Sequence, residues 1–259
     1  MKTYVEWLED FRKKIYEGYE KHRMDKRLAG HVCEVKKPAR KLLKLSGPVM
    51  VYGVPESGEL PPSVVVGTQD VTPSNVGFPI DMRDWAEDPS RRNMDTFMTK
   101  KGKEVAENET RVIIKGMIDN VGYSFNAERK GELSKTDIRK AEDWLKEREV
   151  HPDTIIVDVK QGFEFLRRGE VLEAARIPSS YMPEEQRGPY FLGLLGGLKV
   201  YCIQFDERLA IVYRKNDIIV KNTPLKIYFD NLDRPSKLIL EKWCSSAPII
   251  DEGVVKITL

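Results

Sequence analysis

The most regular pattern of apolar and polar positions lies between residues 94 and 117. Apolar residues recur there at intervals of three, four and seven: Met94, Phe97, Met98, Val105, Val112, Ile113 and Met117. Charged residues fill the other positions: Lys100, Lys103, Glu104, Glu107 and Glu109. This spacing predicts a long helix with one packed stripe and a solvated opposite face. A turn signal at residues 88–90 precedes it and Gly116 is expected to end it, which gives about 25 residues and about 38 Å.

A second amphipathic helix is expected over about residues 4–28. Its apolar residues fall on one side, which must pack against something: Trp7, Leu8, Phe11, Ile15 and Tyr19. Residues 1–45 also hold 13 Lys and Arg against 7 Asp and Glu, so the remainder of the chain is net acidic. Such a basic arm can contact nucleic acid or an acidic partner, although a charge run more commonly marks a solvated surface.

Residues 47–81 differ in character, because they are rich in Val, Pro, Gly and Ser and almost uncharged. Two strand-like runs, 49–54 and 63–66, flank residues 56–62, which predicts a long hairpin or loop projecting from the body. Loops of this length are usually functional or reach a neighbour. The alternative is a disordered linker, which would normally carry more charge.

The second half of the chain predicts mixed helices and strands. Ser134 and Asp137 fit a capping box that opens a helix, with Ile138, Ala141, Trp144 and Leu145 on its apolar face. A short helix is expected through Phe163 and Leu166. Strands are expected at 121–126, 154–159, 198–205, 209–214, 217–220, 225–230, 238–244 and 254–259. The pattern predicts an α+β fold with antiparallel sheet.

Candidate chemistry is sparse. The histidines are His22, His31 and His151, and the sequence has no zinc-protease, serine-hydrolase or phosphate-binding-loop motif. Cys33, Cys202 and Cys244 are scattered without metal-ligand spacing and are expected to be buried apolar residues. A carboxylate-only enzyme and a nucleic-acid-binding module stay open as alternatives, but no catalytic residue, cofactor or metal is predicted.

Composition places the chain among globular proteins. No apolar run is long enough to span a membrane and the N-terminus lacks a secretory signal, so a cytoplasmic, membrane-free location is expected. Charged residues make up 32% while the formal net charge is only +2. Interspersed charge of this kind is typical of heat-adapted proteins.

The order of these parts resembles a known fold. A basic helix, an uncharged loop, FPID before a helix reading KEVAENETRVIIKGM, and strands introduced by GLLGGLKVYCIQ together resemble the Hong Kong 97-type fold of encapsulins (the linocin family) and tailed-virus major capsid proteins. The resemblance implies five segments: an N-terminal arm (1–46), an extended loop or E-loop (47–82), a peripheral domain with the spine helix (83–134), an axial domain (135–217) and strands returning to the peripheral domain (218–259).

The resemblance also implies a function without bond-making chemistry. The chain is expected to assemble with itself into an icosahedral shell, either an encapsulin-like nanocompartment enclosing a cargo protein or a virion capsid enclosing double-stranded DNA with portal and scaffolding proteins. The implied assembly residues, all in the E-loop, are Val51, Tyr52, Pro55, Leu60, Val64 and Val66. The residues assigned to the packed stripe of the spine helix are Phe97, Val105, Val112 and Ile113. The implied contacts to cargo or DNA are Trp7, Phe11, Arg12, Lys13, Lys14 and Ile15.

Three features depart from the family pattern. No lysine occurs between Lys44 and Lys100, so cross-linking through an E-loop lysine is not expected. No long scaffolding segment precedes the arm. The first third of the chain also lacks the usual encapsulin opening.

Overall fold

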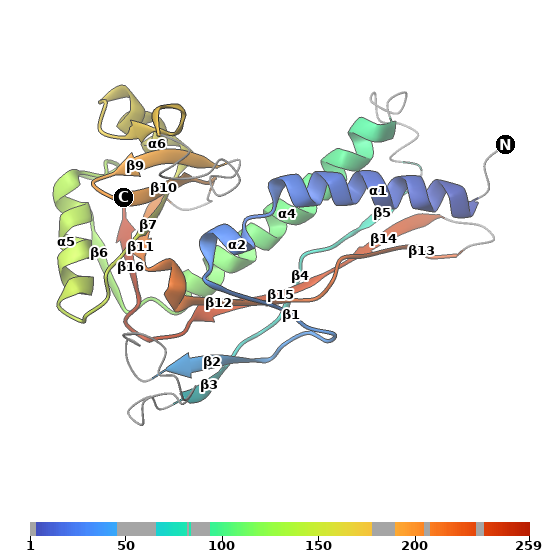
Figure 1. Ribbon diagram of the computed structural model, residues 1–259, viewed down its shortest axis with the longest axis horizontal. Helices are drawn as coiled ribbons and strands as arrows, with labels where there is room; N and C mark the ends of the chain where they lie inside the picture. The colour runs from blue at the N-terminus through green and yellow to red at the C-terminus, as the bar shows by residue number, and fades with distance from the viewer. Residues whose placement is uncertain are drawn as a thin grey trace, which may run out of the picture.

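The computed structural model describes residues 4–45, 66–81, 83, 94–177, 190–204, 208–231 and 236–259. Within these residues the molecule is elongated and has two parts (Figure 1). One part is a pair of helices lying on a long bent β-hairpin, and the other is a seven-stranded sheet with two helices against it. The expected α+β class is confirmed.

The predicted spine helix is α4 (Met94–Ile118), with 25 residues. Five of the predicted apolar positions are buried in it: Phe97, Met98, Val105, Ile113 and Met117. Gly116 does not end the helix, because α4 continues for two more residues. A Cβ atom on Gly116 would lie 2.2 Å from the carbonyl oxygen of Ser246, so this glycine allows close packing against the neighbouring strand.

The predicted N-terminal helix is interrupted near Arg23, giving α1 (Tyr4–His22) and α2 (Asp25–Leu28). Two glycines bring the backbones of α1 and α4 together. A Cβ atom on Gly18 would lie 2.0 Å from the carbonyl oxygen of Thr99, and one on Gly102 would lie 1.9 Å from that of Ile15. The apolar stripe of α1 therefore packs against the spine helix of its own chain.

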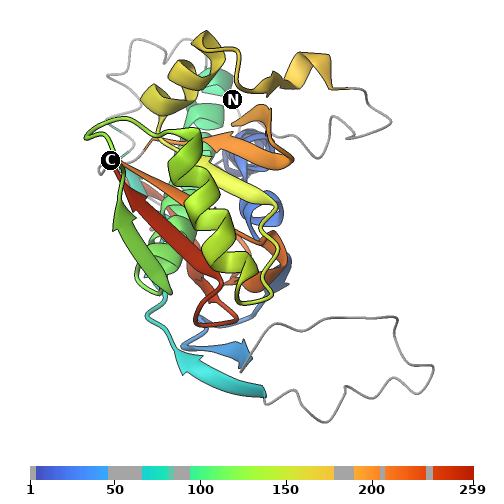
Figure 2. The same cartoon turned by 90° about the vertical axis from the view of Figure 1, so that its left-hand side faces the viewer.

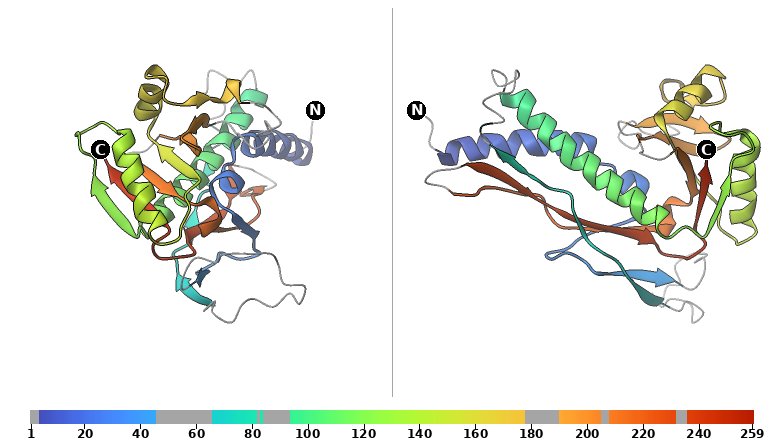
Figure 3. Two further views of the ribbon diagram at one scale, coloured as in Figure 1. Left: turned by 60° about the vertical axis from the view of Figure 1, so that its left-hand side comes forward. Right: turned by 180° about the vertical axis from the view of Figure 1, so that it is seen from behind.

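A long antiparallel hairpin supports both helices (Figure 3, right). Its strands are β12 (Ile218–Asn222), β13 (Lys226–Phe229), β14 (Lys237–Glu241) and β15 (Trp243–Pro248). Three short strands flank it: β1 (His31–Glu34), β4 (Ser74–Asn75) and β5 (Pro79–Asp81). The predicted strand at 238–244 is thus two strands, separated at Lys242.

The second sheet has the strand order β6-β16-β11-β7-β10-β9-β8. Its strands are β6 (Tyr123–Asn126), β7 (Thr154–Val157), β8 (Leu172–Glu173), β9 (Phe191–Leu195), β10 (Leu198–Cys202), β11 (Leu209–Tyr213) and β16 (Val254–Thr258). The structure also has two single turns of 3-10 helix, η2 (Ala174–Arg176) and η3 (Lys215–Asp217). Gly196 and Gly197 both have positive φ, which suits the two-residue turn between β9 and β10.

This sheet is mixed and not simply antiparallel, because β7 with β10 and β6 with β16 are parallel pairs. Every residue of β7 and β11 is buried, as their continuous apolar sequences require of central strands. Helices α5 (Lys135–Lys146) and α6 (Val159–Arg167) contribute to one core with this sheet, and Figure 2 shows α5 lying across it. The capping box of Ser134 and Asp137 is confirmed.

The expected segment boundaries need correction. Strand β6 falls within the predicted peripheral segment and β16 within the predicted return strands, yet both lie in the seven-stranded sheet. The E-loop was expected over 47–82, but β2 (Lys41–Leu45) and β3 (Val66–Asp70) already pair as an antiparallel ribbon. The stretch containing β4 and β5 runs along the hairpin, because buried Ile80 pairs opposite Leu238.

We expect Gly102→Ala to destabilise the protein by about 2 kcal/mol, because overpacking at the α1–α4 crossing outweighs the helix propensity gained. Chemical denaturation followed by circular dichroism measures the effect. Arg111→Ala, at an exposed position of the same helix, is the control and should leave the midpoint nearly unchanged. Equal midpoints for both variants would refute the close crossing.

Candidate assembly interface

Six polar side chains form a buried charge cluster where α1, α2, α4 and the hairpin meet: Tyr19, Arg23, Asp25, Glu109, Asn222 and Lys242. Sequence analysis placed Glu109 on the solvated face of the spine helix, and this was wrong: its exposure is 0%. The spine helix is covered by α1 on one side and by β15 on another, so a single packed stripe does not describe it. Lys242 reaches the cluster from the break between β14 and β15.

The cluster is held by short polar contacts on all sides. Lys242 Nζ lies 3.3 Å from Glu109 Oε1, and the Tyr19 hydroxyl donates to Glu109 Oε2 at 2.6 Å. Asn222 Nδ2 donates to both carboxylates, at 3.0 Å to Asp25 and 3.1 Å to Glu109. Arg23 completes the set with two bonds to Asp25, of 2.6 and 3.0 Å.

Burial acts differently on the two carboxylates. Burial, reinforced by the charge of Asp25, raises the pKa of Glu109, although Lys242 opposes the shift. Burial also acts to raise the pKa of Asp25, but the hydrogen bonds and charge of Arg23 outweigh it and hold that pKa below its ordinary value. Burial and Glu109 together raise the pKa of the Tyr19 hydroxyl, which stays protonated as a donor.

The cluster is structural and not catalytic. Glu109 and Asp25 have no exposed surface and Lys242 is 2% exposed, so no substrate reaches them. Perturbed pKa values also occur in structural ion-pair networks. Within the described ranges, no group of His, Cys, Asp and Glu could hold a metal ion.

Lys242→Met should cost about 3–5 kcal/mol, because Glu109 would be left buried beside a second carboxylate without its cation. The denaturation midpoint measures this loss. The matched control is the double variant Glu109→Gln, Lys242→Met, which keeps the hydrogen-bonding shape and removes both charges. It should be more stable than the Lys242→Met single variant; a double variant that is equally unstable would contradict the charge pairing.

The penalty of Lys242→Met should depend on pH. A raised pKa means that folded Glu109 binds its proton more tightly than the unfolded chain does, so that stability is lost as pH rises through the folded pKa. The loss relative to the unsubstituted protein should therefore be smaller at about pH 5 than at about pH 8. Midpoints measured at both pH values test this, and in the double variant the pH difference attributable to Glu109 should disappear.

Four of the six residues predicted to contact cargo or DNA are already engaged within the chain. Phe11 and Ile15 are buried at 1% and 0% exposure, with Phe11 edge-on to Phe229, so their assignment as contact residues is wrong for this conformation. Arg12 donates to the carbonyl oxygen of Ile227 at 2.9 Å. Lys14 pairs with Asp95 and Glu17.

The outer face of α1 keeps a smaller set of accessible groups. Val5 is 60% exposed and Tyr16 is 40% exposed, with the Tyr16 hydroxyl donating to the carbonyl oxygen of Leu225. Trp7 is partly buried and contacts Phe11 at 5.6 Å between ring centroids. Lys13 is exposed and forms no ion pair with any described residue.

Most of the predicted E-loop residues lie outside the described part of the chain: Val51, Tyr52, Pro55, Leu60 and Val64. Val66 begins β3 and pairs with Leu45, the last residue of β2. The β2–β3 ribbon lies at one side of the molecule (Figure 2), and Leu42 of β2 is buried against residues of the hairpin part. Near the end of the ribbon that leads into residues 46–65, Lys44 pairs with Asp251 at 2.6 Å.

The predicted spine-helix residues are inside the subunit. Phe97, Val105 and Ile113 are buried and Val112 is partly buried against the same core. Their role is therefore to hold the subunit together. Cys33 is exposed, contrary to expectation, whereas Cys202 is half-buried and Cys244 is buried.

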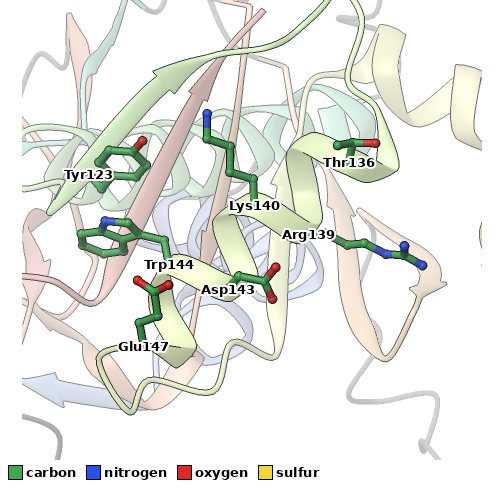
Figure 4. A pocket seen from close by; sticks show the side chains of 7 residues that line it. All are labelled: Tyr123, Thr136, Arg139, Lys140, Asp143, Trp144 and Glu147. Atoms are coloured by element: carbon green, nitrogen blue, oxygen red, sulfur yellow. The ribbon is translucent and has the colours of Figure 1, made fainter.

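A groove on the outer face of α5 was missed by the sequence analysis (Figure 4). Its aromatic wall is Tyr123 stacked on Trp144, with centroids 4.9 Å apart and planes 9° from parallel. Arg148 lies 3.7 Å from the Trp144 ring centroid, and Asp143 and Glu147 line the groove. The spacing of four residues between Lys140, Trp144 and Arg148 could have indicated this groove. The same spacing is equally typical of an ordinary solvated helix face.

Comparison with known proteins gives a result at the level of fold. No protein-family model matches the sequence, and no curated protein matches it. Among solved structures, the virus-like particle from Pyrococcus furiosus matches 97% of this chain and 99% of its own, with 14% identity and a TM-score of 0.60. A structure from Gordonia phage Cozz matches 92% and 86%, with 10% identity and a TM-score of 0.54.

The third similar structure is the holo-SrpI encapsulin complex from Synechococcus elongatus, which matches 88% of this chain and 84% of its own, with 13% identity and a TM-score of 0.51. The chain therefore has the Hong Kong 97-type fold that its order of parts resembles. No helix in the described ranges has both the length and the apolar character needed to cross a bilayer.

Proposed function

We propose that the chain is a structural subunit that assembles with copies of itself into a closed icosahedral shell. The observation that carries this proposal is the match along nearly the whole chain to the Pyrococcus furiosus virus-like particle. Residues 47–65, between β2 and β3, support it: they are almost uncharged and rich in Val and Pro, and a segment of this composition is stabilised by packing on a neighbour. Copies in identical environments must close into rings or run on as fibres, and a shell is the closed case.

In the finer form of the proposal, the shell is an encapsulin-like nanocompartment holding a cargo protein. The similarity to the SrpI encapsulin supports this use. The cargo would meet the accessible face of α1, with Val5, Lys13 and Tyr16 as its contacts, because Phe11 and Ile15 are committed to the subunit core. E-loop residues 47–65 would bind the adjacent subunit, and no catalytic step is assigned to the chain.

The second candidate is the capsid of a tailed virus enclosing double-stranded DNA, with portal and scaffolding proteins as partners. The similarity to Gordonia phage Cozz and the basic excess of residues 1–45 favour it. Lys13 and Lys21 of α1 are exposed and form no ion pair with any described residue. A DNA-binding wall would lose affinity steeply as salt increases.

Gentle purification should yield spherical particles by negative-stain microscopy. A co-purifying protein that resists protease until the shell is opened supports the compartment, whereas nuclease-protected DNA supports the capsid. Particles can also be emptied with high salt and the subunits allowed to reassemble without nucleic acid. Reassembly under these conditions would show that assembly does not require DNA binding. A lone protomer by ultracentrifugation at high concentration would overturn the shell proposal itself.

Deletion of residues 56–62 should reduce particle yield while leaving the circular dichroism spectrum and denaturation midpoint of the subunit nearly unchanged. The reason is that an arm seated on a neighbour stabilises the assembly and adds little to the subunit's own core. Replacing the same seven residues with a Gly and Ser linker of equal length controls for loop length. Normal particles from both variants would show that this tip makes no contact between subunits.

A further inference from the structure

The seven-stranded sheet presents two different surfaces at its opposite edges. Strand β6 forms one edge and β8 forms the other. The aromatic groove, lined by Tyr123 of β6 and by α5, lies at the β6 edge. The most exposed large apolar side chain of the described residues, Phe163 of α6, lies near the β8 edge, since α6 packs on β10 through Gly162 and leads into β8.

The β8 edge carries a knob with a basic border. Phe163 is 66% exposed and Leu172 of β8 is 48% exposed. Lys160 and Arg167 lie three and four positions from Phe163 on α6, so the three share one helix face. Both are exposed. Arg167 pairs with Glu164 of the same helix at 2.6 Å, whereas Lys160 has no ion-pair partner among the described residues.

The β6 edge carries the α5 groove, which is large enough to accept an aromatic side chain. The groove has a volume of about 370 Å³, whereas a cavity of about 150 Å³ already holds a benzene ring. Its wall is the face of the Tyr123–Trp144 stack, and aromatic rings favour stacked or edge-on contact with another ring. Asp143 and Glu147 line the groove beside Trp144 (Figure 4). Glu147 lies 3.7 Å from Arg148, whereas Asp143 forms no ion pair within the described ranges.

We propose that Phe163 of one copy inserts into the α5 groove of the next copy, with Lys160 of α6 facing Asp143. This proposal rests on the proposed shell function and names the contact that repeats around a rotation axis of the shell. A knob and a hollow on opposite edges of one domain make a heterologous contact, which can close into a ring of identical subunits. A self-complementary two-fold contact would instead need both on one surface.

The occupant of the groove is a second copy because the matching knob is on this chain. Aromatic anchors in desolvated pockets contribute a large share of interface energy. Lys160 beside Phe163 and Asp143 beside Trp144, neither of them ion-paired among the described residues, favour one orientation of the two copies. Arg139 and Lys140 also line the groove, within one helical turn of Asp143, and Lys140 lies 4.5 Å from the Phe125 ring centroid.

Disulfide trapping tests the contact directly. Phe163→Cys combined with Asp143→Cys, in a Cys33→Ser background, should give a ladder of linked subunits on a denaturing gel without reductant. Cys202 should not form a disulfide, because burial raises the pKa of its thiol to about 11. Cys244 should not form one either, because it is buried. The two single variants and the pair Phe163→Cys with Lys13→Cys are controls that should not form the ladder.

A second variant tests whether the knob contributes to assembly. Phe163→Asp should lower the fraction of subunits in particles by about tenfold, as expected for loss of an aromatic anchor. Tyr228→Asp, at an exposed aromatic position of β13, is the control and should assemble normally. The denaturation midpoint of unassembled Phe163→Asp should equal that of the unsubstituted subunit, because the side chain is exposed.

The outcomes separate this contact from the shell function. Particles from Phe163→Asp in normal yield, or normal particles of the cysteine pair without the ladder, would overturn the contact while leaving the shell intact. No particles from the unsubstituted protein would overturn the shell function and this contact with it. A ladder together with loss of assembly in Phe163→Asp supports both.

Discussion

The ion pair between Glu109 and Lys242 is the interaction on which the arrangement of the helices and the hairpin depends. It joins the middle of the spine helix to the break in the hairpin, at a point where water does not reach either charge. Asn222 extends the connection to Asp25, and Tyr19 extends it to α1. Buried charges are tolerated only when every partner is present, so this cluster opposes any register in which the helices slide along the hairpin.

Close backbone packing complements that polar connection. Gly18 and Gly102 let α1 approach α4, and Gly116 lets α4 approach β15. A helix held on two sides in this way has little surface left for solvent, which explains why a charged residue of α4 is buried. The elements enclosing the cluster belong to distant parts of the chain, so the helix-and-hairpin part forms only when the N-terminal and C-terminal segments are both in place.

The two parts of the molecule differ in where their distinctive polar and aromatic groups lie. The helix-and-hairpin part is elongated (Figure 3), and its apolar core encloses one buried polar cluster. The seven-stranded sheet has a largely apolar interior, and its distinctive groups are on its edges, where Phe163 and the Trp144 groove lie. Rigid edges with unlike surfaces suit a protein whose role is to tile with copies of itself.

Much of this architecture could be predicted from local patterns. The periodicity of Phe97, Val105 and Ile113 predicted the spine helix because burial of an apolar stripe leaves a 3.6-residue signature. The capping box at Ser134 was predictable because it satisfies backbone groups within four residues of one another. Continuous apolar runs predicted the central strands β7 and β11, and the order of elements was sufficient to suggest the shell fold.

Long-range contacts decided the rest. Nothing local distinguishes buried Glu109 from its solvated neighbour Glu107, because the partner Lys242 lies more than a hundred residues away. Gly116 has the signature of a helix end, but the approach of Ser246 makes it a packing residue. The last strand, β16, lies in the seven-stranded sheet between β6 and β11, which are far from each other in the sequence. Sequence periodicity records which residues avoid water, whereas the tertiary structure alone determines which charges and edges meet.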